Sequence, residues 1–298
     1  MTHDLQAAIA NTPHRITAST SVAAVIGDPV KHSLSPVIHN VGFQSLGIDW
    51  VYVAYEVKAG QAQAALDAMR TFGLRGISVT MPHKSDVADL VDTVSIAAQA
   101  LKSVNTIEVA PDGHLVGHST DGDGLVSSLS AQGVDVTSKS ILILGAGGAA
   151  RSVIDALQRH GCLKIFIANR SLARAQAAQV LAPDISRPIA LNDLATLVST
   201  ISSVDIVINA TSVGMSGNSA HSSKSPLLAD LITPQHTVVD LIYHPIQTEL
   251  LRNAQQRGAQ TVNGLGMLVH QAALQQQIWT GFMPSVSDMY QAALQALS

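Results

Sequence analysis

The chain has 298 residues, of which 47% are hydrophobic and 13% charged, and its formal net charge is −4 at pH 7. This length suits one large domain or two ordinary ones with well-buried cores. The 17 basic residues are dispersed and aromatic residues make up only 3%, so the composition lacks the positive footprint and the stacking surface typical of nucleic-acid-binding proteins. We therefore expect a globular protein with no nucleic-acid partner.

The N-terminal segment and the cysteine content indicate the compartment. The first twenty residues lack a basic segment followed by a continuous apolar run, so we do not interpret them as a signal peptide. The longest apolar run, ILILGAGGAA, is far shorter than the ~20 residues that cross a bilayer. Cys162 is the only cysteine, which rules out internal disulfides and fits a reducing cytoplasm. We expect a cytoplasmic protein with no membrane partner.

In the first half of the chain, apolar strands alternate with helical segments. The apolar and β-branched runs SVAAVIG (21–27), DWVYVAYEV (49–57) and GISVTMP (76–82) predict strands. Between them, PVIHNVGFQSLG and GQAQAALDAMRTFG predict helices that end at Gly47 and Gly73. This βαβ alternation predicts a mostly parallel sheet with functional sites at the carboxyl ends of the strands.

The second half repeats the alternation. The segment at 139–161 predicts a strand, a glycine turn and a helix, KIFIANR predicts a strand, and SLARAQAAQVLA predicts a helix capped by Ser171. Further strands are expected in DIVINATSVGM, HTVVDLIYHPI and AQTV. From Gly264 onward two terminal helices follow, and we expect them to return to the first domain and make it discontinuous.

Lys84 follows the third predicted strand. The run Ile77, Val79, Thr80 favours an extended strand and Pro82 cannot continue a ladder, so the amine of Lys84 should emerge at the strand end. Taken alone, this pattern also fits a solvated lysine beside a turn. The choice between a solvated lysine and a catalytic amine depends on the rest of the chain.

The segment GAGGAA has the pattern of a dinucleotide-binding turn. Gly145, Gly147 and Ala150 fit GxGxxG/A directly after the strand ILIL and at the start of a helix. Gly145 permits the tight turn and Gly147 lets the backbone approach a pyrophosphate, while small residues allow close helix packing. The expected backbone contacts are Gly145, Ala146, Gly147, Gly148 and Ala149. A glycine-rich turn without a ligand is the alternative.

The end of the next strand indicates which dinucleotide binds. NAD-preferring folds usually carry an acidic residue there to hold the ribose 2′-hydroxyl. This chain has Asn169, Arg170 and Ser171, with Arg174 one helical turn later. Two guanidinium groups could flank a 2′-phosphate, so we infer NADP, although solvated surface arginines would give the same pattern.

The twelve histidines do not indicate a metal site. His114 and His118 have i,i+4 spacing, but Gly113 and Gly117 place them in a turn or hairpin. The motifs HExxH and CxxC do not occur. We expect no metal.

Several short segments together resemble the shikimate dehydrogenase family, from about Ser21 to the C-terminus. They are, in order, IGDPVKHSLSPVIHN, VTMPHK, SVNTI, GHSTDGDG, GAGGAAR, ANRSLARA, INATSVGM and GLGMLVHQA. The resemblance implies an α/β fold of two domains. These are a discontinuous N-terminal substrate domain with a mostly parallel sheet, at 21–120 plus 265–298, and a Rossmann-type doubly wound NADP domain at 121–264. Residues 1–20 form an N-terminal extension.

The resemblance also assigns roles to residues of this chain. Lys84 and Asp121 flank the reacting carbon of a hydroxylated cyclohexene carboxylate, and Ser33 and Ser35 hold its carboxylate. The ring hydroxyls contact Thr80, Asn105 and Gln271, and Tyr243 lies near the substrate. The cofactor contacts Thr211, Leu241 and Gly264 besides the glycine turn and the arginines. Each residue also has an ordinary structural explanation, as a helix cap, a turn residue or a solvated side chain.

The chemistry of the two central residues is compatible with these roles. Hydride transfer to a ring ketone develops alkoxide charge and needs a nearby proton donor. A free lysine is protonated at neutral pH, so Lys84 suits reduction, and it must lose its proton before oxidation. Asp121 favours the charged lysine whereas burial opposes it. GHSTD approximates GxSxG, but Asp121 replaces the final glycine, so a nucleophile elbow is not expected.

We therefore expect an NADP-dependent shikimate dehydrogenase that acts on a small molecule as a monomer or homodimer. Three positions depart from the family pattern: Ser78 replaces an asparagine, Ser119 replaces the asparagine of NTDG, and LKSVNTI replaces GAVNT. These changes leave quinate and aminoshikimate-like rings as alternative substrates. A dinucleotide sensor without turnover is a further alternative, which the presence of both Lys84 and Asp121 disfavours.

Overall fold

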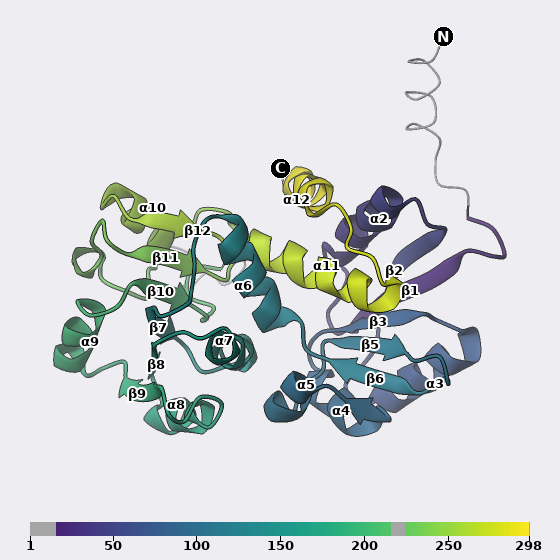
Figure 1. Ribbon diagram of the computed structural model, residues 1–298, viewed down its shortest axis with the longest axis horizontal. Coiled ribbons are helices and arrows are strands. Elements are labelled where there is room, and N and C mark those ends of the chain that lie inside the picture. Colours follow the sequence, from purple (N-terminus) through teal and green to yellow (C-terminus); the bar gives the residue numbers. More distant parts are fainter. Residues whose placement is uncertain (1–15, 216–223, 298) are drawn as a thin grey trace, which may run out of the picture.

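The computed structural model describes residues 16–215 and 224–297, which form two β-sheets flanked by helices (Figure 1). Residues 1–15 of the expected N-terminal extension lie outside the described residues. Residues 16–20 lead into the first strand, where Thr20 Oγ1 donates a hydrogen bond of 2.8 Å to Asp49 Oδ1. The expected α/β class with a Rossmann-type sheet is confirmed.

The first sheet is mixed, with more parallel than antiparallel strand pairs. Its strands are β1 Ser21–Gly27, β2 Trp50–Glu56, β3 Gly76–Val79, β4 Thr93–Val94, β5 Thr106–Val109 and β6 Leu115–His118. They are ordered β2-β1-β3-β5-β6-β4. β1 runs parallel to β2 and β3, and β4 runs parallel to β6, whereas β5 is antiparallel to both of its neighbours.

Helices connect these strands. They are α2 Ser35–Leu46, α3 Ala62–Phe72, α4 Lys84–Leu90 and α5 Ile96–Leu101. The first two end where the sequence predicts, at Gly47 with φ +66° and Gly73 with φ +68°, a left-handed conformation that glycine adopts without steric cost. The predicted strand at 76–82 is shorter than expected and ends at Val79, because Thr80 O accepts the backbone N–H of His83 in a turn.

The hairpin expected around the two histidines is present as β5 and β6. His118 Nε2 lies 3.0 Å from Glu108 Oε2, and His114 Nδ1 lies 2.9 Å from Asp112 Oδ2. Within residues 16–215 and 224–297, no group of three or more His, Cys, Asp or Glu side chains could hold a metal ion.

The second sheet is entirely parallel. Its strands are β7 Ser140–Leu144, β8 Lys164–Asn169, β9 Ser186–Ala190, β10 Ile206–Asn209, β11 Thr237–Asp240 and β12 Gln260–Val262. They are ordered β12-β11-β10-β7-β8-β9, the doubly wound order of dinucleotide-binding folds. The helices are α7 Gly148–Arg159, α8 Leu172–Gln179, α9 Leu194–Ile201 and α10 Glu249–Gln256, with the short 3₁₀ helix η1 Ala229–Leu231.

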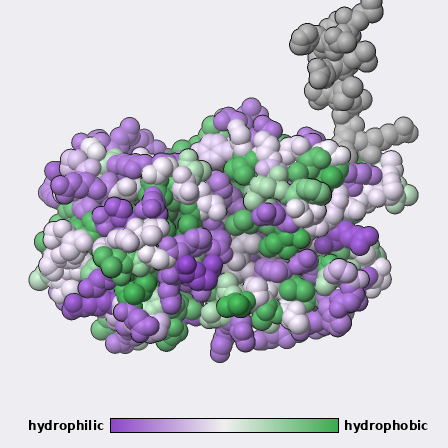
Figure 2. All heavy atoms as spheres, viewed as in Figure 1, coloured by the Kyte–Doolittle hydropathy of each residue, from purple (hydrophilic) through white to green (hydrophobic). Residues whose placement is uncertain are grey.

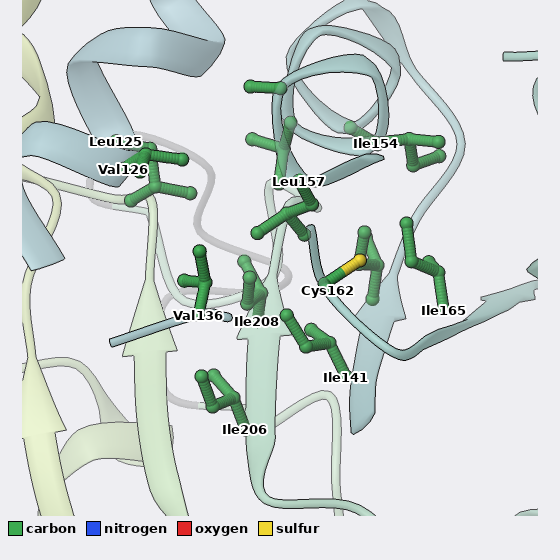
Figure 3. Close-up of a cluster of buried hydrophobic side chains, with 14 of the residues drawn as sticks. Leu125, Val126, Val136, Ile141, Ile154, Leu157, Cys162, Ile165, Ile206 and Ile208 are labelled. Carbon is green, nitrogen blue, oxygen red and sulfur yellow. The ribbon is translucent and has the colours of Figure 1, made fainter. Parts of the chain in front are cut away.

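Alternate residues of these strands build two cores, because successive side chains of a strand point to opposite faces. Ile141 and Ile143 belong to the core that includes residues of α7 and α8, and Leu142 and Leu144 belong to the core that includes residues of α9 and α10. Cys162 lies inside the first of these cores (Figure 3). Burial raises the pKa of its thiol to about 11, so the side chain stays protonated and acts as an apolar core residue.

Three helices lie where the two sheets meet: α6 Asp121–Ala131, α11 Leu265–Thr280 and α12 Val286–Ala296 (Figure 1). Both α11 and α12 pack against α2 in one apolar cluster that includes Ile38, Val269 and Met289. Trp279 Nε1 of α11 also donates a 2.9 Å hydrogen bond to Ile107 O of β5. The end of the chain thus returns to the first sheet.

The visible face of the molecule carries interspersed hydrophilic and hydrophobic residues (Figure 2). Large apolar side chains are exposed at separate places in the fold, for example Phe72 at the end of α3, Ile96 at the start of α5 and Leu163 before β8. Among the helices of the described residues, none combines the length and the apolar character needed to cross a membrane.

Candidate active site

Lys84 and Asp121 come from different elements and form an ion pair. Lys84 is the first residue of α4, reached by a turn from the end of β3, and Asp121 is the first residue of α6. Lys84 Nζ donates a hydrogen bond of 2.6 Å to Asp121 Oδ2. The side chains are 30% and 17% exposed, so both remain accessible from the adjoining pocket. The structure therefore brings together the two residues that the sequence singled out.

The other carboxylate oxygen of Asp121 is held by Asn105. Asn105 Nδ2 donates hydrogen bonds to Asp121 Oδ1 at 2.7 Å and to Thr120 Oγ1 at 3.0 Å, which uses both of its amide hydrogens. Its Oδ1 accepts from the Thr120 N–H and from the Thr106 hydroxyl. Asn105 is 3% exposed, so in this arrangement its amide orients Asp121, and a ring hydroxyl must compete for the same hydrogens.

The ion pair lies on the wall of a pocket of about 400 Å³ between the two sheets. All eight residues expected at the reaction centre and around the substrate line it, namely Ser33, Ser35, Thr80, Lys84, Asn105, Asp121, Tyr243 and Gln271. Three residues expected at the cofactor line it as well: Ala149, Leu241 and Gly264. The remaining cofactor residues do not line this pocket.

Other lining residues were not expected at the site from the sequence, although Ser78 was noted as a departure from the family pattern. These are Val25, Pro29, Val30, His32, Ser78, Val79, Met267, Leu268 and Gln275. His32, Met267 and Leu268 lie within the short segments that carry the family resemblance, so their position was a usable signal. Gln275 lies one helical turn after Gln271 on α11, and this i,i+4 spacing places the two side chains on the same helix face.

Ser33 and Ser35 lie at the start of α2. Ser33 Oγ accepts the backbone N–H of Ser35 at 3.2 Å and donates to Ser35 Oγ at 3.0 Å. Leu34 occupies the N-cap position and makes no side-chain cap, so neither serine is the N-cap residue itself. Both hydroxyls also line the pocket, where the helix N-terminus favours a negative group.

The glycine turn after β7 has the geometry of a dinucleotide site. Gly145 has φ +111°, and a Cβ there would lie 3.0 Å from Ala210 O, so glycine is required for both conformation and space. A Cβ on Gly147 or Gly148 would meet nothing within 4 Å, which leaves open space in front of the first turn of α7. Ala150 is fully buried and allows α7 to pack closely on the sheet. These residues fit a bound pyrophosphate.

The segment 169–174 at the end of β8 carries two cations and no acidic residue. Arg170 and Arg174 are exposed, and neither forms an ion pair with any other described residue. Asn169 Nδ2 donates to Ser171 O at 2.9 Å, which shapes the turn before α8. Ser171 occupies the N-cap position of α8 as expected, but the expected side-chain cap is wrong, because its hydroxyl accepts no backbone N–H of the helix. That hydroxyl is free for a ligand.

A buried carboxylate organises the loops after β10 and β11. Asp240 Oδ1 accepts from Asn209 Nδ2 at 3.0 Å, and Asp240 Oδ2 accepts from the Thr248 hydroxyl at 2.7 Å. Thr211 Oγ1 donates to Asn209 Oδ1 at 2.7 Å, which ties this expected cofactor residue to the same network. Burial raises the pKa of Asp240 to about 6, and the hydrogen bonds oppose that shift.

Leu241 and Gly264 lie in close contact beyond this network. A Cβ on Gly264 would lie only 2.1 Å from Leu241 O, so the residue before α11 must be glycine for the loop after β11 to approach. This contact brings the N-terminus of α11 to the carboxyl end of β11, and Tyr243 reaches the pocket from the same loop.

Three family models match this chain in sequence order. The shikimate dehydrogenase substrate binding domain matches residues 25–107, shikimate / quinate 5-dehydrogenase matches residues 128–235, and the shikimate 5′-dehydrogenase C-terminal domain matches residues 264–294. Together they span most of the described residues.

Individual proteins match over nearly the whole chain. A curated shikimate dehydrogenase (NADP(+)) of Alkaliphilus oremlandii is 41% identical over 270 residues, covering 89% of this chain and 93% of the relative. The crystal structure of shikimate 5-dehydrogenase from Listeria monocytogenes, in complex with shikimate and NAD, is 35% identical with a TM-score of 0.89, covering 94% of this chain and 98% of that chain.

A quinate dehydrogenase from Corynebacterium glutamicum, in complex with NAD, is 30% identical with a TM-score of 0.85, covering 93% of this chain and 99% of that chain. The three family models cover Lys84, the glycine turn and most of the two terminal helices, and Asp121 lies between the first two models. The chain therefore belongs to the shikimate dehydrogenase family.

Proposed function

We propose that this protein is an NADP-dependent shikimate dehydrogenase that reversibly reduces 3-dehydroshikimate to shikimate. The observation that carries the proposal is the 2.6 Å contact between Lys84 Nζ and Asp121 Oδ2 on the wall of the interdomain pocket. An ammonium held by a carboxylate at this place is a proton donor beside the carbon that accepts hydride. The curated relatives named shikimate dehydrogenase (NADP(+)) support the assignment.

The pocket residues divide into groups with different roles. Ser33 and Ser35 hold the substrate carboxylate, since their hydroxyls gather at the N-terminus of α2. The other polar side chains contact ring hydroxyls or orient the groups that do so; they are Thr80, Asn105, Tyr243 and Gln271. A volume of about 400 Å³ lies within the range of small-molecule sites.

The cofactor is NADP, whose reduced form would supply a hydride for reduction and whose oxidised form would accept one for oxidation. The glycine turn would hold its pyrophosphate, because the open space there faces the N-terminus of α7; the residues of this turn are Gly145, Ala146, Gly147, Gly148 and Ala149. Arg170 and Arg174 would hold the 2′-phosphate through charge-assisted hydrogen bonds, with Asn169 and Ser171 beside them. Thr211, Leu241 and Gly264 contact the part of the cofactor nearest the pocket.

Lys84 handles the proton. During reduction its ammonium donates a proton to the carbonyl oxygen as hydride reaches the carbonyl carbon, and the neutral amine then regains a proton from solvent. Oxidation reverses these steps, with the neutral amine accepting the hydroxyl proton. Asp121 holds Lys84 Nζ through one oxygen while Asn105 fixes the other oxygen, so the carboxylate cannot rotate away.

We propose the domain boundaries that the sequence indicates. The substrate domain comprises 21–120 plus 265–298, the NADP domain comprises 121–264, and 1–20 is an extension. The return of α11 and α12 to α2 supports the discontinuous first domain. The reduced, buried Cys162 supports a cytoplasmic location, and the protein acts as a monomer or a homodimer.

Quinate is the second candidate substrate. It is favoured by the likeness to the Corynebacterium quinate dehydrogenase and by Ser78, which lines the pocket where the family usually has asparagine. The test is the rate of nicotinamide absorbance change with shikimate and with quinate, each with NADP and with NAD. We expect the highest kcat/KM for shikimate with NADP. A higher kcat/KM for quinate would make the protein a quinate dehydrogenase, and no turnover of either would support a dinucleotide sensor.

A further inference from the structure

Tyr52 lies behind the pocket wall and does not line the pocket, yet it is connected to the wall by hydrogen bonds. It belongs to β2, is 2% exposed, and its ring stacks on His39 with centroids 4.0 Å apart and an interplanar angle of 2°. Its hydroxyl donates a 2.6 Å hydrogen bond to Ser78 Oγ. Ser78 is 6% exposed and lines the pocket.

The chain of hydrogen bonds continues from Ser78 along α11. Ser78 Oγ donates to Gln275 Oε1 at 2.6 Å, and Gln275 Nε2 donates to Gln271 Oε1 at 2.9 Å. Gln271 Nε2 then donates to Leu268 O at 2.8 Å. Tyr52 is thus linked through three side chains to the backbone carbonyl of Leu268 on α11, the helix that forms one wall of the pocket.

Two backbone carbonyls fix the direction of every bond in this chain. Gln275 Nε2 also donates to Asn105 O, and Gln271 Nε2 donates to Leu268 O. A carbonyl can only accept, so the nitrogen of each amide must face it and the oxygen must face the other way. Gln275 Oε1 therefore needs a donor, which is the single proton of Ser78.

Once Ser78 has donated its proton to Gln275, it can only accept from its other neighbours. Tyr52 supplies that proton, and burial raises the pKa of its phenol well above the ordinary value, so the phenol remains a donor. The Ser78 oxygen retains one lone pair that no described residue uses, and Ser78 lines the pocket. Gln271 likewise retains one N–H that no described residue uses. This wall therefore offers one acceptor and one donor, the pair that recognises a hydroxyl group.

We propose that Tyr52 is a positioning residue that sets substrate recognition from behind the pocket wall. It holds Ser78 as a hydrogen-bond acceptor and, through Gln275, holds the Gln271 amide as a donor, so that both face one ring hydroxyl of the substrate. The inference rests on the proposed function for the identity of the ligand. The hydrogen-bond chain itself is independent of that function. Without the Tyr52 proton, Ser78 is free to turn its own proton elsewhere and release Gln275.

The decisive variant is Tyr52→Phe, which retains the ring that stacks on His39 and removes only the hydroxyl. A neutral hydrogen bond of this kind corresponds to about a 2- to 10-fold change in affinity. We expect KM for the substrate to rise by that factor while kcat and KM for NADP stay within about two-fold. Tyr55→Phe is the matched control, because Tyr55 lies on the same strand and is 48% exposed. If kcat, KM for the substrate and KM for NADP all worsen by a similar factor, the proposal is overturned.

A double-variant comparison separates positioning from a general structural effect. If Tyr52 acts through Ser78, Tyr52→Phe should have no further effect on substrate KM in a Ser78→Ala protein. If the two substitutions raise substrate KM by factors that multiply in the double variant, the proposed chain of hydrogen bonds would be contradicted.

A measurement without turnover distinguishes failure of this inference from failure of the proposed function. In ¹⁵N–¹H spectra of the free protein, the side-chain amide signals of Gln271, assigned by their loss in Gln271→Ala, should shift in Tyr52→Phe and stay in place in Tyr55→Phe. Unshifted Gln271 signals in Tyr52→Phe would overturn the relay even in a protein that oxidises shikimate. If the Gln271 signals shift but the protein does not oxidise shikimate, only the proposed function would be contradicted.

Discussion

Lys84 Nζ and Asp121 Oδ2 lie 2.6 Å apart although 37 positions separate the two residues in the sequence. Each is the first residue of a helix, and the two helices follow β3 and β6 of the same sheet. Because Asp121 begins the helix α6, which packs on α7 and α11, the ion pair also joins the substrate-binding sheet to the elements next to the cofactor turn.

The first prediction concerns Lys84. Lys84→Ala removes the proton donor, and general acid–base groups typically contribute about 10²- to 10⁴-fold to the rate. We therefore expect kcat to fall by about that factor while the Kd for NADP stays unchanged, as measured by steady-state kinetics and by calorimetry. Lys164→Ala is the control, since Lys164 lies at the start of β8, away from the pocket. A loss of less than about five-fold in Lys84→Ala would argue for a solvated lysine.

The second prediction concerns cofactor choice. Charge-assisted hydrogen bonds contribute about 1.5–3 kcal/mol, so Arg170→Ala or Arg174→Ala should weaken NADP binding by roughly 10- to 150-fold. NAD lacks the 2′-phosphate and its affinity should change little. Calorimetric titration with both cofactors measures this difference. Arg187, exposed on β9, supplies the control Arg187→Ala. Equal losses for the two cofactors would contradict the assignment.

The third prediction concerns Gly124 on α6. A Cβ there would lie 2.7 Å from both the Cβ and the backbone nitrogen of Gln271, and backbone cannot give way as a flexible side chain can. Gly124→Ala should therefore shift α11, lower the free energy of unfolding by about 1–3 kcal/mol and raise KM for the substrate. Ser130→Ala, on an exposed position of the same helix, should do neither. Denaturation and steady-state assays on both variants would show whether α6 and α11 are packed this closely.

The fourth prediction concerns the pH dependence of stability. The pKa of Asp240 is raised from 3.8 to about 6 in the folded chain because the carboxyl is buried. Between these values the folded state binds more protons than the unfolded state, so stability falls as pH rises. The full difference corresponds to about 3 kcal/mol.

The comparison that isolates Asp240 is with Asp240→Asn, which cannot ionise. From about pH 4 to about pH 7 the wild-type chain should lose about 3 kcal/mol of unfolding free energy relative to the variant, measured by urea denaturation. Asp184→Asn, at an exposed site, should give no such difference. A wild-type chain that gains stability relative to Asp240→Asn over this interval would show that the carboxyl is not destabilised by burial.

Local sequence patterns were sufficient for the elements that carry the chemistry. The β-branched run before Pro82 placed Lys84 at a strand end, and the strand, glycines and helix around Gly145 defined the dinucleotide turn. The helix ends at Gly47 and Gly73 could also be predicted, because glycine readily adopts the left-handed conformation that both residues have in the structure. In these segments the local propensity and the final fold agree.

Other elements could not be predicted because tertiary contacts determine them. The segment DGDGLVSSLSA has two glycines and a weak helical pattern, so Asp121 could equally be a turn residue. The glycines are needed because a Cβ on Gly122 would lie 2.1 Å from Ser152 O of α7, and one on Gly124 would contact α11. Similarly, β9 contains Pro188, which is tolerated because β9 is an edge strand of its sheet.

The wall behind the substrate site was also beyond sequence reasoning. Ser78 was recognised as a departure from the family pattern, but its partners Tyr52 and Gln275 lie 26 and 197 positions away. No local pattern connects residues at such separations. The structure is needed to show that the shorter side chain at position 78 forms hydrogen bonds with a tyrosine and a glutamine.

The most direct test of the account is the pH dependence of hydride transfer from shikimate to NADP, followed by rapid mixing. Lys84 must release its proton before it can accept the hydroxyl proton, so the rate should rise from neutral to alkaline pH. The rise should be absent in Lys84→Ala. A wild-type rate that does not change over this range, or the same rise in both proteins, would contradict the role of Lys84 as the acid and base of the reaction.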